Sequence, residues 1–146
     1  MKNLKFLHVG ITVSDMKETI EFYTKYFGFQ LNMEGRFDEE FLRQRRVLYG
    51  LEDGAYSDFC MLESPDGIAL ELFQFQPQLP SKGENGIWNR AGYTHICLKV
   101  DNIFQVYEKL KEDGIPFFFE PDFRGNPDEH WVFLKDPDGN LIELQD

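Results

Sequence analysis

LKDPDGNLIEL, at residues 134–144, is the stretch that decides the fold, because the chain contains a close counterpart, LESPDGIALEL, at residues 62–72. The two segments share the pattern L-x-x-P-D-G-x-x-x-E-L, 72 positions apart. Each predicts a β-hairpin, since Pro-Asp-Gly is typical of a tight turn in which Gly supplies the positive φ. Glu71 and Glu143 therefore occupy equivalent positions in two similar hairpins.

A second pair of matching segments precedes the hairpins. HVGITVSD at 8–15 matches HICLKVDN at 95–102, which indicates a tandem duplication. The predicted modules cover about 1–76 and 93–146, joined by a linker at 77–92 that is rich in Pro and Gly. A chain of 146 residues has the size of one domain, and each module is small enough to gain stability from the other. We expect a single α+β domain.

Hydrophobic periodicity and turn residues predict the elements of each module. In the first module they are strand 5–13, helix 16–27 capped by Asp15 and ended by Gly28, strand 29–34, a short helix within 35–53 ended by Gly50, and hairpin strands 57–63 and 68–76. In the second they are strand 93–100, helix 102–113 capped by Asp101, strand 116–120, loop 121–129 and a final hairpin over 130–145.

Composition narrows the function. A net charge of −11 disfavours binding to nucleic acid or to an anionic membrane, because both need a basic surface. No apolar run approaches the length of a membrane span, and no secretory signal is recognised, so we expect a cytoplasmic protein. Cys60 and Cys97 both lie in apolar strand patterns, which predicts that both are buried and reduced.

Two histidines and two glutamates occupy equivalent places in the modules: His8, Glu71, His95 and Glu143. A single His or Glu in such a strand is more commonly solvated or hydrogen-bonded to the backbone. Four of them at equivalent places favour a divalent metal site, because imidazole and carboxylate suit Zn, Ni, Co, Mn or Fe(II). Burying four such groups without a partner would be costly.

The densest positive cluster of this acidic chain is Arg36, Arg43, Arg45 and Arg46. One interpretation is a solvated surface that balances neighbouring acidic residues. The other is a gate that presents one arginine, such as Arg36, to an anionic substrate. The remaining candidates for substrate binding are Tyr49, Phe75, His130 and Trp131, for each of which packing or a surface position is the alternative.

The two-module pattern, H-x-x-(I/L)-x-V-x-(D/N) followed by D-G-x-x-x-E-L, resembles the vicinal oxygen chelate superfamily. That superfamily includes glyoxalase I, methylmalonyl-CoA epimerase, extradiol dioxygenases, and fosfomycin and bleomycin resistance proteins. The resemblance implies two tandem βαβββ modules that form a curved mixed sheet around a metal cleft, one divalent ion per site held by His8, Glu71, His95 and Glu143, a small-molecule substrate and a homodimer. The His-Glu-His-Glu set is similar to that of bacterial glyoxalase I.

The expected chemistry is proton abstraction next to a metal-chelated carbonyl, in a lyase or an isomerase. Glu71 and Glu143 are then the candidate catalytic bases. Relatives that bind glutathione carry Arg four positions after the first ligand and Asn four positions after the second. Thr12 and Phe75 stand at those positions here, which argues against glutathione as the substrate.

Two other functions stay open. An Fe(II) extradiol-type dioxygenase would use His8, His95 and Glu143 as a facial triad. Such enzymes resemble one another in a Tyr about ten positions before the last ligand, where this chain has Phe133. The alternative outside enzymology is a protein that sequesters a drug or other small ligand without chemistry.

Overall fold

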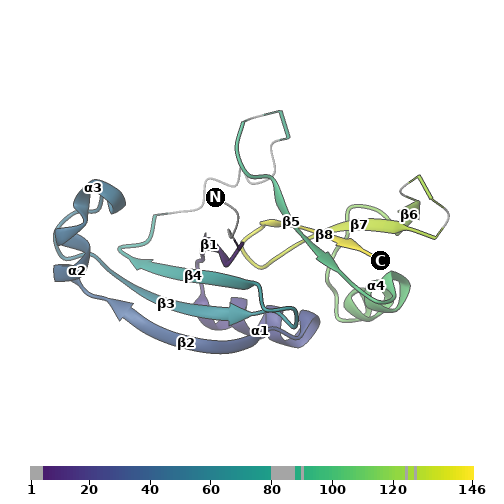
Figure 1. Cartoon of the computed structure of the whole chain (residues 1–146), viewed down its shortest axis with the longest axis horizontal. Helices are drawn as coiled ribbons and strands as arrows, with labels where there is room; N and C mark the ends of the chain where they lie inside the picture. The colour runs from purple at the N-terminus through teal and green to yellow at the C-terminus, as the bar shows by residue number, and fades with distance from the viewer. Residues whose placement is uncertain (1–4, 80–87, 90, 124, 127) are drawn as a thin grey trace. The chain divides into compact units, whose positions relative to one another are not determined.

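The computed structural model describes residues 5–79, 88–89, 91–123, 125–126 and 128–146. The chain divides into two compact units, Met1–Pro80 and Ser81–Asp146, and each described unit contains one four-stranded sheet (Figure 1). The division falls within the segment 77–92 that the sequence predicts as a linker. Residues 80–87 and 90 of that segment lie outside the described residues.

The first unit contains β1 (His8–Thr12), α1 (Met16–Phe27), β2 (Gln30–Phe37), α2 (Glu39–Gln44), α3 (Arg46–Tyr49), β3 (Tyr56–Glu63) and β4 (Ala69–Gln76). Its sheet has the order β1-β4-β3-β2, in which β1 and β4 are parallel and the other pairs are antiparallel. Helix α1 begins where Asp15 accepts a hydrogen bond from the backbone N–H of Glu18, and it ends at Gly28 with a φ of 70°.

Helix α1 covers one face of this sheet. The Sγ atom of Cys60 lies 3.4 Å from the Sδ atom of Met16, and the backbone N–H of Met16 donates to the side chain of Gln74. Leu62 and Leu72 are fully buried on the same face. Because successive strand residues point to opposite faces, Glu71 and Phe73 lie on the face opposite α1.

The second unit contains β5 (His95–Lys99), α4 (Ile103–Glu112), β6 (Asp122–Phe123), β7 (His130–Lys135) and β8 (Leu141–Gln145). Its sheet order, β5-β8-β7-β6, and its strand directions repeat those of the first unit. The register repeats as well, because Gly10 lies opposite Glu71 and Cys97 lies opposite Glu143. The α+β architecture of two βαβββ modules is thus confirmed, with α2 and α3 inserted in the first.

Four local predictions need correction. Helix α4 is capped by Asn102, which accepts from the backbone N–H of Gln105, and not by Asp101. The expected strand 116–120 is reduced to a single bridge between Phe117 and Leu134, since prolines at both of its ends limit the ladder. The expected loop 121–129 contains the short strand β6 instead, and the insertion forms two short helices where one was expected.

The two cysteines differ in environment. Cys60 is buried as predicted, whereas Cys97 is exposed, so the prediction of a buried Cys97 is wrong. The reason is the face of β5: Cys97 alternates with Ile96 and Leu98 and shares the face of His95. Among the described helices, none has the length and apolar character needed to cross a membrane.

Candidate metal centre

The first half of the candidate site joins β1 and β4. Their parallel register sets His8 opposite Ala69, so His8 lies diagonally next to Glu71 on the face opposite α1. The Nε2 atom of His8 is 3.2 Å from Oε2 of Glu71. The two side chains keep 43% and 22% of their surface exposed, which leaves this pair accessible.

The second half joins β5 and β8 in the same way. The Nε2 atom of His95 is 3.0 Å from Oε2 of Glu143, and their side chains are only 24% and 9% exposed. Two further hydrogen bonds fix this pair: the Thr94 hydroxyl lies 2.9 Å from Nδ1 of His95, and the Gln145 amide donates to Oε1 of Glu143 at 2.8 Å. The pair of the second unit is therefore more buried than that of the first and is held in place.

The duplication makes the difference between the two pairs easy to trace. The positions equivalent to Thr94 and Gln145 are Leu7 and Phe73, whose side chains form no hydrogen bonds. Within the described chain, the only polar side chain that contacts the Glu71 carboxylate is His8. Glu71 thus has a free carboxylate oxygen and an aromatic neighbour, whereas Glu143 has both oxygens engaged.

Aromatic rings surround the second pair. The rings of Phe133 and Trp88 lie 5.1 and 5.3 Å from the imidazole of His95, measured between centroids. Phe133 is also the cross-strand neighbour of Glu143. These rings limit water around His95 and Glu143 and restrict the orientation of the imidazole.

The donor atoms fit a divalent transition metal. Two ligands about 2.1 Å from one ion lie about 3.0 Å apart in octahedral geometry and about 3.4 Å apart in tetrahedral geometry, which brackets the two observed His–Glu distances. The same distances suit a direct hydrogen bond, and metal binding would replace the imidazole proton in it. Among the described residues, no group of three or more His, Cys, Asp or Glu lies close enough to hold a metal ion, so each His–Glu pair contributes two donors.

Three of the predicted substrate-binding residues share the faces of the glutamates. Phe75 follows Glu71 at an even spacing on β4, and the ring of Tyr49 lies 6.2 Å from that of Phe75. Trp131 packs edge-on against Phe133 at 5.7 Å, on the face of Glu143.

The structure places the other two, Arg36 and His130, on the opposite faces. Arg36 on β2 is the cross-strand partner of Asp58 on β3 and donates two hydrogen bonds to its carboxylate, at 2.6 and 3.0 Å. The His130 ring lies 3.2 Å from a carboxylate oxygen of Asp146, on the α4 side of the second sheet. Strand alternation thus directs each side chain to the face of its own sheet opposite the glutamate, and a role in substrate binding stays a prediction for both.

Asp146 is tightly held in that arrangement. Burial would raise the pKa of its carboxyl group, but hydrogen bonds from the backbone N–H groups of His130 and Ile103 and from the His130 ring outweigh burial and lower it. This contact explains the position of His130 by packing and hydrogen bonding.

Sequence reasoning missed Thr94 and Gln145, which hydrogen-bond to His95 and Glu143, and Cys97, which shares their face of the sheet. Their signal was present, because Cys97 and Gln145 follow His95 and Glu143 by two positions and therefore share their faces. Thr94 precedes His95 directly, and only the side-chain geometry shows that its hydroxyl reaches the ring.

Residues 5–144 match the family model described as the glyoxalase, bleomycin resistance protein and dioxygenase superfamily. The chain belongs to this superfamily. It is similar to a probable lactoylglutathione lyase of Vibrio cholerae, with 30% identity over 145 residues that cover 99% of this chain and 91% of that protein.

Solved structures of this superfamily share the fold. A glyoxalase family protein from Bacillus cereus superposes with a TM-score of 0.79 at 21% identity, covering 99% of this chain and 95% of the other. The fosfomycin resistance protein FosX from Listeria monocytogenes, solved with Mn(II) and sulfate, gives a TM-score of 0.60 at 16% identity and covers 99% and 92% of the two chains.

Proposed function

We propose that His8, Glu71, His95 and Glu143 together hold one divalent metal ion, Ni, Co, Zn or Mn, in a glyoxalase-like lyase or isomerase. The observation that carries this proposal is the equivalence of the two His–Glu pairs, at 3.2 and 3.0 Å, on the sheet faces that α1 and α4 leave uncovered. Each unit supplies one imidazole nitrogen and one carboxylate oxygen, which together are half of a four-ligand set.

The two glutamates have different roles in this proposal. A divalent ion, when bound, supplies Lewis acidity that lowers the barrier to removing a proton next to a substrate carbonyl. Glu71 is the general base, because one of its oxygens has no partner among the described residues and its side chain is accessible. Glu143 is a fixed ligand, because Gln145 and His95 engage both of its oxygens.

The substrate differs from the glutathione adduct named in relatives. The Vibrio cholerae relative is named a probable lactoylglutathione lyase. In this chain Thr12 and Phe75 occupy the positions where glutathione-binding relatives carry Arg and Asn, so a glutathione carboxylate would lose its charged partner. Slow or absent turnover of the methylglyoxal–glutathione hemithioacetal is the expected result.

Metal content of the untagged protein, measured by elemental mass spectrometry before and after loading, tests the proposal. We expect about one Ni, Co, Zn or Mn per site, loss of most of that metal in Glu143→Gln, and retention in Glu71→Gln. Exchange of α-protons in D₂O, followed by NMR over a panel of α-hydroxy and α-keto carbonyl compounds, should be abolished in Glu71→Gln. Protein that binds no metal after loading would refute the proposal.

Iron selectivity would favour the dioxygenase instead. Phe133, the cross-strand neighbour of Glu143, provides no hydroxyl at the position of the dioxygenase tyrosine. Retention of iron alone, together with ring cleavage of catechol after anaerobic iron loading, would support that alternative over the lyase or isomerase.

A homodimer is part of the proposal, and the ligand pairs allow a direct test of how its sites are built. One variant carries His8→Ala with Glu71→Ala, and the other carries His95→Ala with Glu143→Ala. If each site combines units of two chains, mixing the two metal-free variants restores one intact site per dimer. If each site is built from one chain, mixing restores none, and sedimentation velocity reports the dimer in either case.

A further inference from the structure

The face opposite α1 carries a continuous set of aromatic rings next to Glu71. Phe73 lies two residues after Glu71 on β4, and its ring is 6.1 Å from that of Phe37. Phe37 stacks on Phe59 at 4.4 Å and on Phe41 of α2 at 4.3 Å, with interplanar angles of 26° and 13°. We call Phe37, Phe41, Phe59 and Phe73 the aromatic face.

These rings are placed for contact and not for core filling. Each of the four is half-buried, whereas the core of the unit lies on the α1 side of the sheet. The position of the Phe59 ring requires glycine at residue 35, because a Cβ atom there would lie 2.8 Å from two atoms of the ring. A side chain there would force the ring out of the stack.

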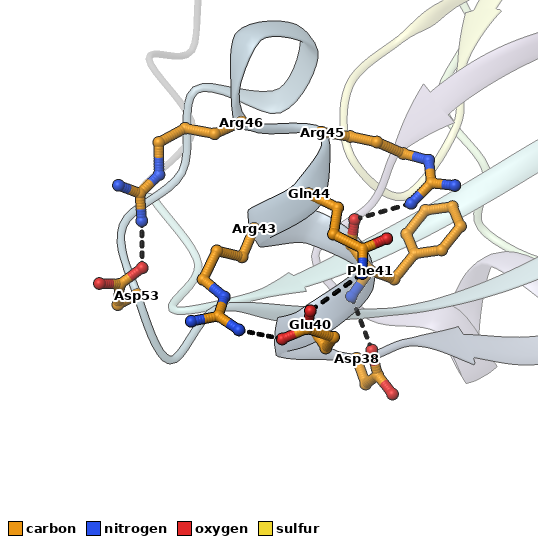
Figure 2. Close-up of polar contacts among 8 residues, drawn as sticks. All are labelled: Asp38, Glu40, Phe41, Arg43, Gln44, Arg45, Arg46 and Asp53. Atoms are coloured by element: carbon orange, nitrogen blue, oxygen red, sulfur yellow. Dashed lines mark hydrogen bonds and ion pairs between the residues drawn. The ribbon is translucent and has the colours of Figure 1, made fainter.

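Arg45 places a positive charge at the Phe41 end of the aromatic face. Its guanidinium lies 3.8 Å from the ring centroid of Phe41 and donates to the Phe41 carbonyl oxygen at 3.1 Å. Figure 2 shows Arg45 and Phe41 on one side of α2, directed away from Arg43 and Arg46.

Four arginines, Arg36, Arg43, Arg45 and Arg46, form the positive cluster of the chain, and among the described residues only Arg45 is not in an ion pair. Arg36, Arg43 and Arg46 form ion pairs with Asp58, Glu40 and Asp53, respectively. In the described part of the chain, Arg45 has no carboxylate partner, and its stacked guanidinium keeps donors free for an oxyanion.

We propose that the aromatic face and Arg45 bind the substrate, and that the substrate has a flat apolar body bearing an anionic group. The body would lie along the ring edges of Phe37 and Phe59, the anion would contact Arg45, and the reacting end would lie toward Glu71. In a chain of net charge −11, a local cation is needed to hold an anion against the overall repulsion. The proposal specifies the substrate class of the proposed function and rests on it for the reaction, but not for binding.

Two matched probes test this proposal without the metal: naphthalene-2-carboxylate and its neutral analogue naphthalene-2-carboxamide, titrated calorimetrically into metal-free protein. We expect the carboxylate to bind about tenfold more tightly than the carboxamide, as one charge-assisted hydrogen-bonded contact would give. Arg45→Gln should remove that difference and leave carboxamide binding unchanged. Phe59→Leu should weaken both probes by a similar factor of about five, because it removes a ring that the apolar body contacts.

Arg43→Gln is the matched control, since Arg43 belongs to the same helix and is already paired with Glu40. It should leave the affinities for both probes unchanged, and circular dichroism should show that all variants are folded. Equal binding of the two probes to the wild-type protein, no binding of either, or equal effects of Arg43→Gln and Arg45→Gln would overturn the proposal. Retained naphthoate binding in a protein that takes up no metal would refute the proposed function alone.

Discussion

Replacing Gln145 by Leu removes one hydrogen bond from the more buried half of the candidate metal centre. The amide of Gln145 donates to Oε1 of Glu143 at 2.8 Å, and the Glu143 side chain is only 9% exposed. Leucine has a similar volume but no donor, so the carboxylate oxygen would lose its protein partner while the packing stays nearly the same. Gln145 is a positioning residue, because it acts on the metal only through Glu143.

The magnitude follows from the burial of that oxygen. Leaving a buried acceptor without its partner costs about 1–3 kcal/mol, and the residual exposure of Glu143 favours the lower part of that range. With a urea m-value of about 1.5 kcal/mol/M, the unfolding midpoint of the metal-free protein should fall by about 1 M. Loss of a partner that orients a metal ligand typically weakens metal binding about 10- to 100-fold.

Gln44→Leu is the matched control, since Gln44 donates a similar 2.9 Å hydrogen bond to Glu40 on an exposed helix surface. Urea unfolding of the metal-free proteins measures stability, and calorimetric titration with Ni(II) and Zn(II) measures affinity. Gln44→Leu should change the free energy of unfolding by less than about 0.5 kcal/mol and leave metal affinity unaltered. If Gln145→Leu bound both ions as tightly as the wild type, the assignment of Gln145 as a positioning residue for a metal ligand would be refuted.

Three other predictions use residues around the same elements. Cys97 should react rapidly with iodoacetamide and be protected by bound metal, whereas Cys60, whose pKa burial raises to about 11, should react only on unfolding; equal rates would contradict this difference. Paramagnetic Ni(II) should quench the fluorescence of Trp88, which lies 5.3 Å from His95, and Trp88→Phe should lose much of the quenching. The pKa of Asp146 is lowered in the folded protein, so its contribution to stability is present above its unfolded pKa of about 3.9 and is lost as pH falls through the folded value. Asp146→Asn should therefore be less stable at pH 7 and show a smaller loss of stability below pH 4 in urea titrations; an unchanged pH profile would contradict the role of the His130 contact.

The duplication explains why so much of the fold was predictable. A hairpin motif and a strand motif, each present twice, specify the element order and the equivalence of His8, Glu71, His95 and Glu143. The cap of the second helix follows from the same equivalence: Asn102, and not Asp101, caps α4, and it stands at the position equivalent to the helix cap Asp15. Other errors lie where the two copies differ. The expected strand 116–120 fails between two prolines, where ladder donors are missing.

Side-chain direction is where sequence reasoning was weakest for the site. Arg36 and His130 are close in sequence to residues of the candidate site, yet strand alternation directs them to the opposite faces, where Asp58 and Asp146 hold them. A shift of one residue in a strand moves a side chain to the other face of the sheet, so proximity in sequence is a poor guide there. Phe75 and Trp131, which have the right parity, lie on the faces of the glutamates.

By itself, the sequence determined the two-module architecture and the four candidate ligands, because period-two alternation, turn residues and repetition are local properties that need no tertiary contact. Only the tertiary structure decided that the pairs differ. Glu143 is fixed by Gln145 and Glu71 is free, since hydrogen bonds across neighbouring side chains depend on orientation and burial. The same holds for Arg45: four arginines look alike in sequence, and ion pairing in three dimensions leaves one of them available for an anion.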